Sequence, residues 1–322
     1  MHRDTGGHLQ CIYSASGVAR IHVLPQPAVY AAEVPTRGPS TYVRGMGWAE
    51  MEWKVEGRTG CAILGEEVRD VRDASSRKPF ALANWKMAMT ISESLAFVHA
   101  FGAAVGNLAQ AVDVVLCPPF TALYAVAQAL AGSPVGLGAQ DLCAAPGKAH
   151  TGEISAPLLA NAGCEWVLLG HWEIRRRTGE SDADVNHKMH AALGAGLRPI
   201  LLIGEAASER GRVEEGLSAR LPHLFAGCEP EQVAQMAVVY EPEWTIGVQE
   251  PALPDPVAAG CGFIRRWIGG EYGAGVAEGM RVIYGGSVAP EYAGGLWPRR
   301  RSTDWVPAAK DGTPLPSPRS CG

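Results

Sequence analysis

The chain has 322 residues, of which 47% are hydrophobic and 19% charged, the balance of a globular α/β protein that can bury a large core. Its formal net charge of −5 argues against nucleic acid or an anionic membrane surface as the main partner. The eight cysteines show no CxxC pair or repeated spacing, so we expect buried thiols in a reducing cytoplasm. No apolar stretch has the length of a membrane span, and residues 1–10 lack the apolar core of a signal peptide.

The chain divides into three parts by the rhythm of its apolar residues. Residues 1–78 carry short apolar patches among glycine, proline and charge, and we interpret them as an extension of uncertain order. From residue 79 to about 296, short apolar strands alternate with amphipathic helices, which indicates parallel strand–helix–strand units with right-handed crossovers. Residues 297–322 form a tail rich in proline, serine and arginine, for which we predict disorder.

Seven strands and six helices are predicted within residues 79–296. The strands are expected at 80–84, 112–117, 135–139, 165–169, 198–203, 235–240 and 280–284. The helices are expected at 90–105, 119–131, 155–162, 182–195, 207–225 and 255–272. This many strand–helix repeats predict a (β/α) barrel, in which the carboxyl ends of the parallel strands surround one mouth.

Polar residues follow four of the expected strands at their carboxyl ends. Asn84 and Lys86 come at the end of the first strand, and His171 follows the fourth. Glu241 follows the sixth strand, and the segment Gly285-Gly286-Ser287 follows the last. Because a barrel brings these strand ends to one mouth, we expect a catalytic site there.

Glu241 is the most informative of these residues, because an apolar strand precedes it and a proline-opened loop, 242–247, follows it. The loop contains an aromatic residue and ends in a glycine, which is typical of a lid that excludes water. A carboxylate whose pKa is raised in an enclosed site is a suitable base. A solvated loop glutamate or a salt-bridge partner is the alternative, favoured for an isolated glutamate but not in this constellation.

The segments around these residues resemble one known family in their order and spacing. They are Ala83-Asn84-Trp85-Lys86-Met87, Gly138-Ala139-Gln140, Thr151-Gly152-Glu153-Ile154-Ser155, Leu169-Gly170-His171-Trp172-Glu173, Ile203-Gly204-Glu205, Tyr240-Glu241-Pro242, Trp244-Thr245-Ile246-Gly247 and Tyr284-Gly285-Gly286-Ser287-Val288. Residues 80–296 resemble triosephosphate isomerase. The resemblance implies a TIM (β/α)8-type barrel and a cytoplasmic, cofactor-free aldose–ketose isomerase of glycolysis and gluconeogenesis. Such an enzyme interconverts glyceraldehyde 3-phosphate and dihydroxyacetone phosphate through an enediolate.

The resemblance implies a role for each polar side chain at the mouth. Glu241 would be the base, while His171 and Lys86 would stabilise the oxygens of the enediolate. Asn84 would orient its neighbours by hydrogen bonds. As alternatives, His171 could be a hydrogen-bonded core residue, Lys86 a surface lysine and Asn84 an ordinary turn residue.

Phosphate binding calls for backbone N–H groups at glycines, where the chain can approach an anion closely. The resemblance implies this role for Gly247, Gly285, Gly286 and Ser287. No cluster of His, Asp or Glu at the strand ends has the spacing of metal ligands, so we expect no metal.

Partners and supporting acids are also implied by the resemblance. The loop from Gln140 to Glu153 resembles the one that inserts into the neighbouring subunit of the family's dimer, so a homodimer is implied. Glu173 corresponds to a second acid near the lysine, and we expect Glu205 to form a structural ion pair. The expected partners are a small phosphorylated sugar and a second copy of the chain, with no nucleic acid and no membrane.

The chain departs from the family's usual pattern close to the site. Trp172 stands where a serine usually follows the histidine, and Ile174 stands where an arginine is usual. In the lid, Gly247-Val248-Gln249-Glu250 replaces the usual Gly-Thr-Gly-Lys, and Glu243 lies beside the base. These changes leave open a four-carbon substrate, a ketose phosphate of the L-erythrulose 1-phosphate type.

The largest departure is the lack of a normal eighth strand after Ser287. The segment 304–309 is short and contains a proline, which cannot donate to a central ladder. A barrel without this strand exposes two edges and loses part of its phosphate site, so a catalytically impaired homologue is an alternative. A segment of the extension, for instance 60–65, is another candidate for the gap.

Overall fold

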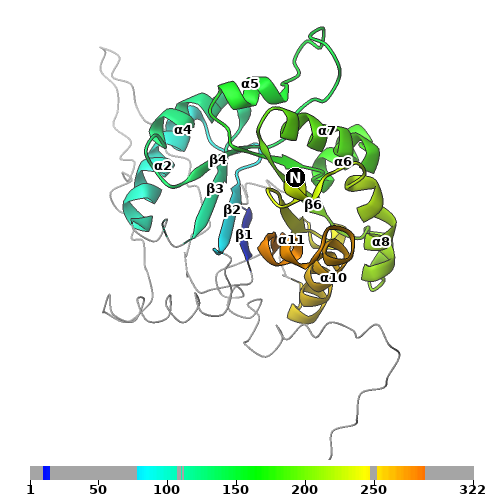
Figure 1. Ribbon diagram of the computed structural model, residues 1–322. Coiled ribbons are helices and arrows are strands. Elements are labelled where there is room, and N and C mark those ends of the chain that lie inside the picture. The colour runs from blue at the N-terminus through cyan, green and yellow to red at the C-terminus, as the bar shows by residue number, and fades with distance from the viewer. Residues whose placement is uncertain (1–9, 15–77, 107–109, 111, 247–251, 287–322) are drawn as a thin grey trace, which may run out of the picture.

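A computed structural model describes residues 10–14, 78–106, 110, 112–246 and 252–286 (Figure 1). The strands are β1 (Gln10–Ser14), β2 (Phe80–Asn84), β3 (Asp113–Cys117), β4 (Gly136–Ala139), β5 (Trp166–Leu169), β6 (Arg198–Ile203), β7 (Ala237–Tyr240) and β8 (Arg281–Tyr284). The α-helices are α2 (Ile91–Val105), α4 (Leu123–Ala129), α5 (Ala156–Asn161), α6 (Trp172–Thr178), α7 (Asp182–Gly194), α8 (Val213–Leu224), α9 (Pro230–Val233), α10 (Pro254–Tyr272) and α11 (Ala274–Gly279). Short 3-10 helices are η2 (Phe120–Ala122), η3 (Ala207–Glu209) and η4 (Glu243–Thr245). Gly247, Ser287, the segment 60–65 and the tail 297–322 lie outside the described residues.

Strands β2 to β8 follow one another around a barrel, each pairing in parallel with the next. The described sheet is closed, because β1 pairs with both β2 and β8. In Figure 1 the strands lie at the centre of the molecule and the helices lie around them. The predicted (β/α) barrel is therefore confirmed, with seven parallel strands and one antiparallel strand.

The strand that closes the barrel comes from the amino-terminal extension. In β1, Gln10 pairs with Asn84, and Tyr13 pairs with Ala81 on one side and with Tyr284 on the other. The five-residue strand thus supplies ladder partners to two edges that would otherwise be unpaired. Because β1 runs antiparallel to its neighbours, its amino end lies beside Asn84, at the mouth.

All seven strands predicted between residues 79 and 296 are confirmed, each within two residues at its boundaries. The helix predicted at 207–225 is instead divided into η3 and α8, because Gly211 between them adopts a φ of +86° that a continuous helix does not allow. The helices α6, α9 and α11 were not among those predicted, since each is too short to display a clear helical period. Within the described ranges, no helix is both long and apolar enough to span a membrane.

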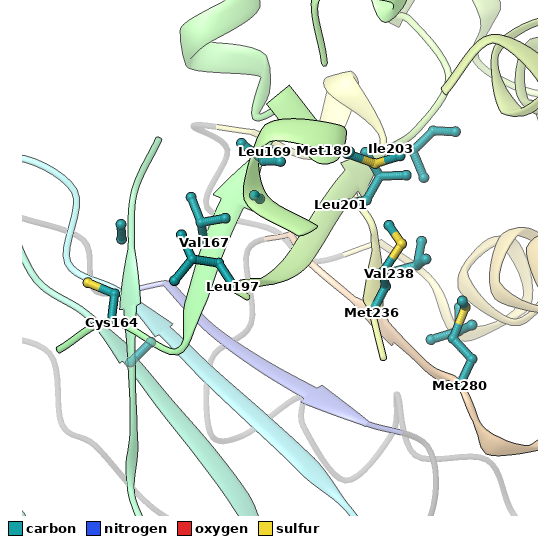
Figure 2. Packing of buried hydrophobic residues seen from close by; sticks show 14 of the residues in the cluster. Cys164, Val167, Leu169, Met189, Leu197, Leu201, Ile203, Met236, Val238 and Met280 are labelled. Atoms are coloured by element: carbon teal, nitrogen blue, oxygen red, sulfur yellow. The ribbon is translucent and has the colours of Figure 1, made fainter. Parts of the chain in front are cut away.

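Two apolar clusters lie on opposite sides of the sheet, because successive side chains of a strand point to opposite faces. One cluster consists of strand residues alone and fills the barrel: Phe80, Leu82, Val115, Cys117, Trp166, Leu168, Ile200, Leu202, Ala237, Val239 and Ile283. The other joins the outer faces of the strands to the helices, as Leu169 and Leu201 beside Met189 of α7 illustrate (Figure 2). Strands packed on both faces are rigid supports for the residues at their carboxyl ends.

Candidate active site

The carboxyl ends of β2, β5 and β7 bring Lys86, His171 and Glu241 to the same mouth of the barrel. The side chain of Glu241 is completely buried, and that of His171 is only 5% exposed. His171 Nε2 lies 3.7 Å from Glu241 Oε1. On the other side, His171 Nδ1 lies 3.9 Å from Glu173 Oε2, and Glu173 Oε1 contacts Lys86 Nζ at 2.6 Å. The structure therefore brings the three expected catalytic side chains into one connected constellation.

Glu241 is held by the sheet and by close backbone packing. Its N–H donates to the carbonyl of Ile203 in β6 at 2.8 Å, so the residue directly after β7 still belongs to the ladder. A Cβ added at Gly204 would lie 2.2 Å from the Glu241 carbonyl oxygen. Only glycine fits at position 204, since the chain of β6 must pass this close to the backbone of Glu241.

His171 is the N-cap residue of α6, and its ring orientation follows from that role. Its Nδ1 accepts a hydrogen bond from the backbone N–H of Glu173 at 3.1 Å. A neutral imidazole that accepts at Nδ1 carries its proton on Nε2. The helix start therefore aims an N–H donor at the space beside Glu241, as an electrophile for a developing oxyanion requires.

Lys86 has a backbone conformation that is rare for a residue other than glycine, with a φ of +51°. Its N–H donates to Asn84 Oδ1 at 3.0 Å, and its carbonyl accepts from Gln140 Nε2 at 2.8 Å. Gln140 also donates to the carbonyl of Cys117 and so fixes the segment to β3. The predicted orienting role of Asn84 thus has a geometric counterpart, because its side chain holds the peptide that presents Lys86.

Glu173 keeps the ammonium group of Lys86 in place. Partial burial raises the pKa of Glu173, but the hydrogen bond from Lys86 and the positive charges of Lys86 and Arg176 outweigh this effect. The net result is a pKa below the ordinary value of 4.5, so the carboxylate is ionised at neutral pH. The Lys86–Glu173 pair is therefore a charged pair at the rim of the site.

Two glycines after β8, Gly285 and Gly286, were predicted to bind phosphate, and their surroundings differ. The N–H of Gly285 donates to the carbonyl of Tyr240 at 2.8 Å and so extends the β7–β8 ladder; its role in phosphate binding stays a prediction. Gly286 passes so close to Tyr284 and Thr245 that a Cβ there would lie 2.1 Å from the tyrosine hydroxyl oxygen. The other two predicted phosphate residues, Gly247 and Ser287, lie outside the described residues.

Glu205 supports the stem of the lid rather than an ion pair. This fully buried carboxylate accepts hydrogen bonds from Tyr240 Oη at 2.9 Å and from Trp244 Nε1 at 2.7 Å. Burial, and then the charge of Glu205, raise the pKa of Tyr240 far above its usual value, so its hydroxyl remains a donor. The prediction of an ion pair for Glu205 is wrong within the described part of the chain. Its two carboxylate oxygens accept instead from the neutral donors Tyr240 Oη and Trp244 Nε1.

Sequence reasoning missed the contacts that join α6 to the segment after β7. Trp172 Nε1 donates to the carbonyl of Glu241 at 2.9 Å, and Arg176 Nε donates to Glu243 Oε1 at 2.8 Å. The other oxygen of Glu243 accepts from the N–H of Ala207 at 2.7 Å. Burial raises the pKa of Glu243, but these two donors outweigh it, and the net pKa lies below the ordinary value. The sequence signals were the bulky residue at position 172 and the acidic Glu243 beside the base, but neither indicated its partner.

Comparison with known proteins agrees with this geometry. The family model of triosephosphate isomerase matches residues 79–300. The chain belongs to the triosephosphate isomerase family. It is 42% identical over 217 residues to the triosephosphate isomerase of Chloroflexus aurantiacus, and the aligned region covers 67% of this chain and 86% of that protein. It is 44% identical over 218 residues to that of Symbiobacterium thermophilum, which covers 67% and 84% respectively.

A solved structure gives the same result for the fold. The crystal structure of the triosephosphate isomerase from Bartonella henselae matches with a TM-score of 0.58 and 33% sequence identity. The match covers 66% of this chain and 84% of that one.

Among the described residues, no group of three or more His, Cys, Asp or Glu could hold a metal ion.

Proposed function

We propose that this protein interconverts glyceraldehyde 3-phosphate and dihydroxyacetone phosphate in the cytoplasm. The observation that carries the proposal is the completely buried Glu241 carboxylate, 3.7 Å from an imidazole nitrogen whose ring is fixed by a helix N-terminus. Family membership, with relatives about 40% identical over most of their length, supports the same activity.

In this reaction Glu241 takes a proton from the carbon next to the substrate carbonyl and returns it to the neighbouring carbon. His171 Nε2–H donates to the carbonyl oxygen as negative charge develops there, and the ammonium of Lys86 stabilises the same charge. The proton removed from one carbon is added to the other, and a hydroxyl proton moves from the oxygen of the first carbon to the former carbonyl oxygen, a transfer for which His171 Nε2 is the proposed carrier. No electron donor or acceptor is needed.

The substrate phosphate would be held by backbone N–H groups of Gly247, Gly286 and Ser287. Gly286 supports this assignment, because Tyr284 leaves no room for a Cβ at this position. A backbone without a side chain at the mouth can be approached closely by an anion. The antiparallel β1 closes the sheet where the family's eighth strand is expected, and this counters the loss of stability that a missing strand would cause.

We also propose that the protein acts as a homodimer through the loop from Gln140 to Glu153. Residues 145–153 of this loop are exposed, and in Figure 1 the segment that leads into α5 projects away from the barrel. Met87, directly after Lys86, is an apolar side chain that is 100% exposed in the single chain. An exposed methionine beside the active site is a suitable contact for a loop from a second copy.

A coupled isomerase assay tests the proposed reaction. We expect Glu241→Gln to lower kcat by about 10²–10⁴-fold, because positioned general-base catalysis contributes on this scale. Glu165→Gln, which removes an exposed glutamate at the amino end of β5, is the matched control and should retain the parental kcat. A parent no faster than Glu241→Gln would refute the proposal, and faster turnover of L-erythrulose 1-phosphate would replace the triose with the four-carbon substrate.

A further inference from the structure

Trp172 is placed so that it bonds to the backbone of the residue we propose as the base. It is the first residue of α6, directly after His171, and its side chain is half-buried. Its indole N–H donates to the carbonyl oxygen of Glu241 at 2.9 Å. A residue type that is unusual at this position in the family therefore touches the peptide unit of Glu241.

The peptide unit between Glu241 and Pro242 lies between two neighbours. Its nitrogen belongs to a proline and has no hydrogen to donate, so the carbonyl is the group by which this unit can be held. Trp172 donates to that carbonyl on one side. On another side the unit lies against Gly204, where an added Cβ would come within 2.6 Å of Pro242 N. A rotation of this peptide must therefore break the Trp172 hydrogen bond or press on the backbone of β6.

The ring of Trp172 is itself oriented by charge. The guanidinium of Arg220 in α8 lies 5.0 Å from the ring centre, and that of Arg175 lies 5.9 Å from it. An open cavity of about 470 Å³, also bordered by Arg176, lies beside the ring, so close packing does not hold it from that side. The cation–π contacts and the hydrogen bond to Glu241 therefore contribute to the orientation of the ring.

We propose that Trp172 is a positioning residue: its indole N–H fixes the Glu241 peptide, and through it the direction in which the carboxylate points. His171 and Trp172 are adjacent, so the start of α6 carries both the imidazole and the group that places the base beside it. The kinetic part of this inference rests on the proposed isomerase function, but its geometric part does not. A displacement of about 1 Å at the reacting atoms can cost about 10²-fold in rate.

Trp172→Phe tests the inference, because it keeps an aromatic ring against Arg220 and removes the N–H donor together with one ring of the indole. We expect kcat to fall about tenfold, the scale of losing one hydrogen bond to a buried carbonyl, while KM changes less than about twofold. Trp172→Leu, which also lacks a donor, should show the same division between kcat and KM. The control is Trp267→Phe in α10, a half-buried tryptophan that packs on Phe225 in the outer layer, and it should retain the parental kcat.

A double-mutant cycle distinguishes positioning from a general loss of structure. In Glu241→Asp the carboxylate is already displaced by the shorter side chain, so adding Trp172→Phe should lower kcat by less than about threefold further. Fully additive losses in the double variant would overturn the inference. So would a Trp172→Phe variant with the parental kcat.

Crystal structures of the parent and of Trp172→Phe supply a test that needs no turnover. We expect the Glu241 carboxylate of the variant to move by about 0.5 Å relative to His171, a smaller displacement than the 1 Å that costs about 10²-fold and so in keeping with a tenfold loss. Carboxylates that superimpose would overturn the inference even if the parent proved inactive. An inactive parent with a displaced variant carboxylate would instead refute the proposed function and leave the positioning role standing.

Discussion

At the scale of single residues, the placement of Glu241 depends on the absence of a side chain at Gly204. An added Cβ would lie 2.2 Å from the carbonyl oxygen of Glu241 and 2.4 Å from its carbonyl carbon. Both contacts are with backbone atoms, which cannot move aside as the end of a flexible side chain can. The strands β6 and β7 must therefore separate if any larger residue occupies this position.

We expect Gly204→Ala to lower both kcat and the free energy of unfolding, the latter by about 1–3 kcal/mol, the usual cost of overpacking. Chemical denaturation and the coupled assay measure the two effects. Gly194→Ala in α7 is the matched control, because a Cβ there meets nothing within 4 Å. It should preserve kcat and raise stability by up to about 1 kcal/mol. Equal behaviour of the two variants would contradict this account of Gly204.

The Lys86–Glu173 pair predicts a pH dependence of stability. Because the folded-state pKa of Glu173 lies below its ordinary value of 4.5, the ionised carboxylate favours the folded state. Its contribution is complete above about pH 4.5 and is lost as the pH falls through the lowered pKa. The Tm difference between the parent and Glu173→Gln, measured by calorimetry, should therefore be largest near neutral pH and shrink below pH 4.5. A difference that does not change with pH would count against the ionised pair.

The sequence predicts most of the site residues but not how they are held. Asn84, Lys86, His171 and Glu241 follow apolar strands, and a parallel barrel brings such positions together whatever else the chain does. The contact of Trp172 with Glu241 depends instead on how α6 docks after its first turn. Residues 69 positions apart carry no shared local pattern, so this contact could not be predicted.

At the scale of elements, the antiparallel β1 changes how the barrel is completed. The seven parallel strands were predictable, because each is an apolar run followed by a helical segment. β1 has no such context: it is five residues long, and its place depends on the unpaired edges of two strands far along the chain. The position of β1 is determined by the unpaired edges of β2 and β8, which exist only once the rest of the sheet has assembled.

A proline within β1 should weaken the closure of the barrel. We expect Ile12→Pro to lower the Tm, because a proline has no N–H to donate to a ladder that is paired on the β2 side at this residue. For a domain of this size each kcal/mol lost lowers the Tm by about 2–4 °C. Ile12→Val keeps the backbone donor and is the control, with a Tm close to that of the parent. An unchanged Tm in Ile12→Pro would show that β1 contributes little to stability.

At the scale of the whole molecule, the exposed surface next to Lys86 allows the proposed homodimer to be tested. Met87 is fully exposed in the single chain and follows Lys86 directly, so a loop from a second copy of the chain could cover it in the proposed dimer. A charge at this point would have to be desolvated if the proposed dimer buries it, which weakens the association. The assembly should therefore respond to a single substitution there.

We expect Met87→Asp to shift the molar mass measured by light scattering from that of a dimer toward that of a monomer. Leu253→Asp introduces the same charge at another exposed apolar residue, at the start of α10, and should leave the mass unchanged. A parent that is monomeric at micromolar concentration would contradict the dimer proposal directly. Equal masses for the parent and both variants would remove Met87 from the interface.

The closing strand also has a consequence for how the protein is made. Ser14 pairs with Ile283, so two residues about 270 positions apart must meet, and at about 5–20 residues per second the ribosome needs roughly 15–50 s to synthesise the chain between them. β1 is therefore synthesised first, but it can pair with β8 only after nearly the whole barrel has been synthesised. Throughout that interval β1 has at least one bare edge, which a nascent chain on the same messenger RNA could capture by strand exchange.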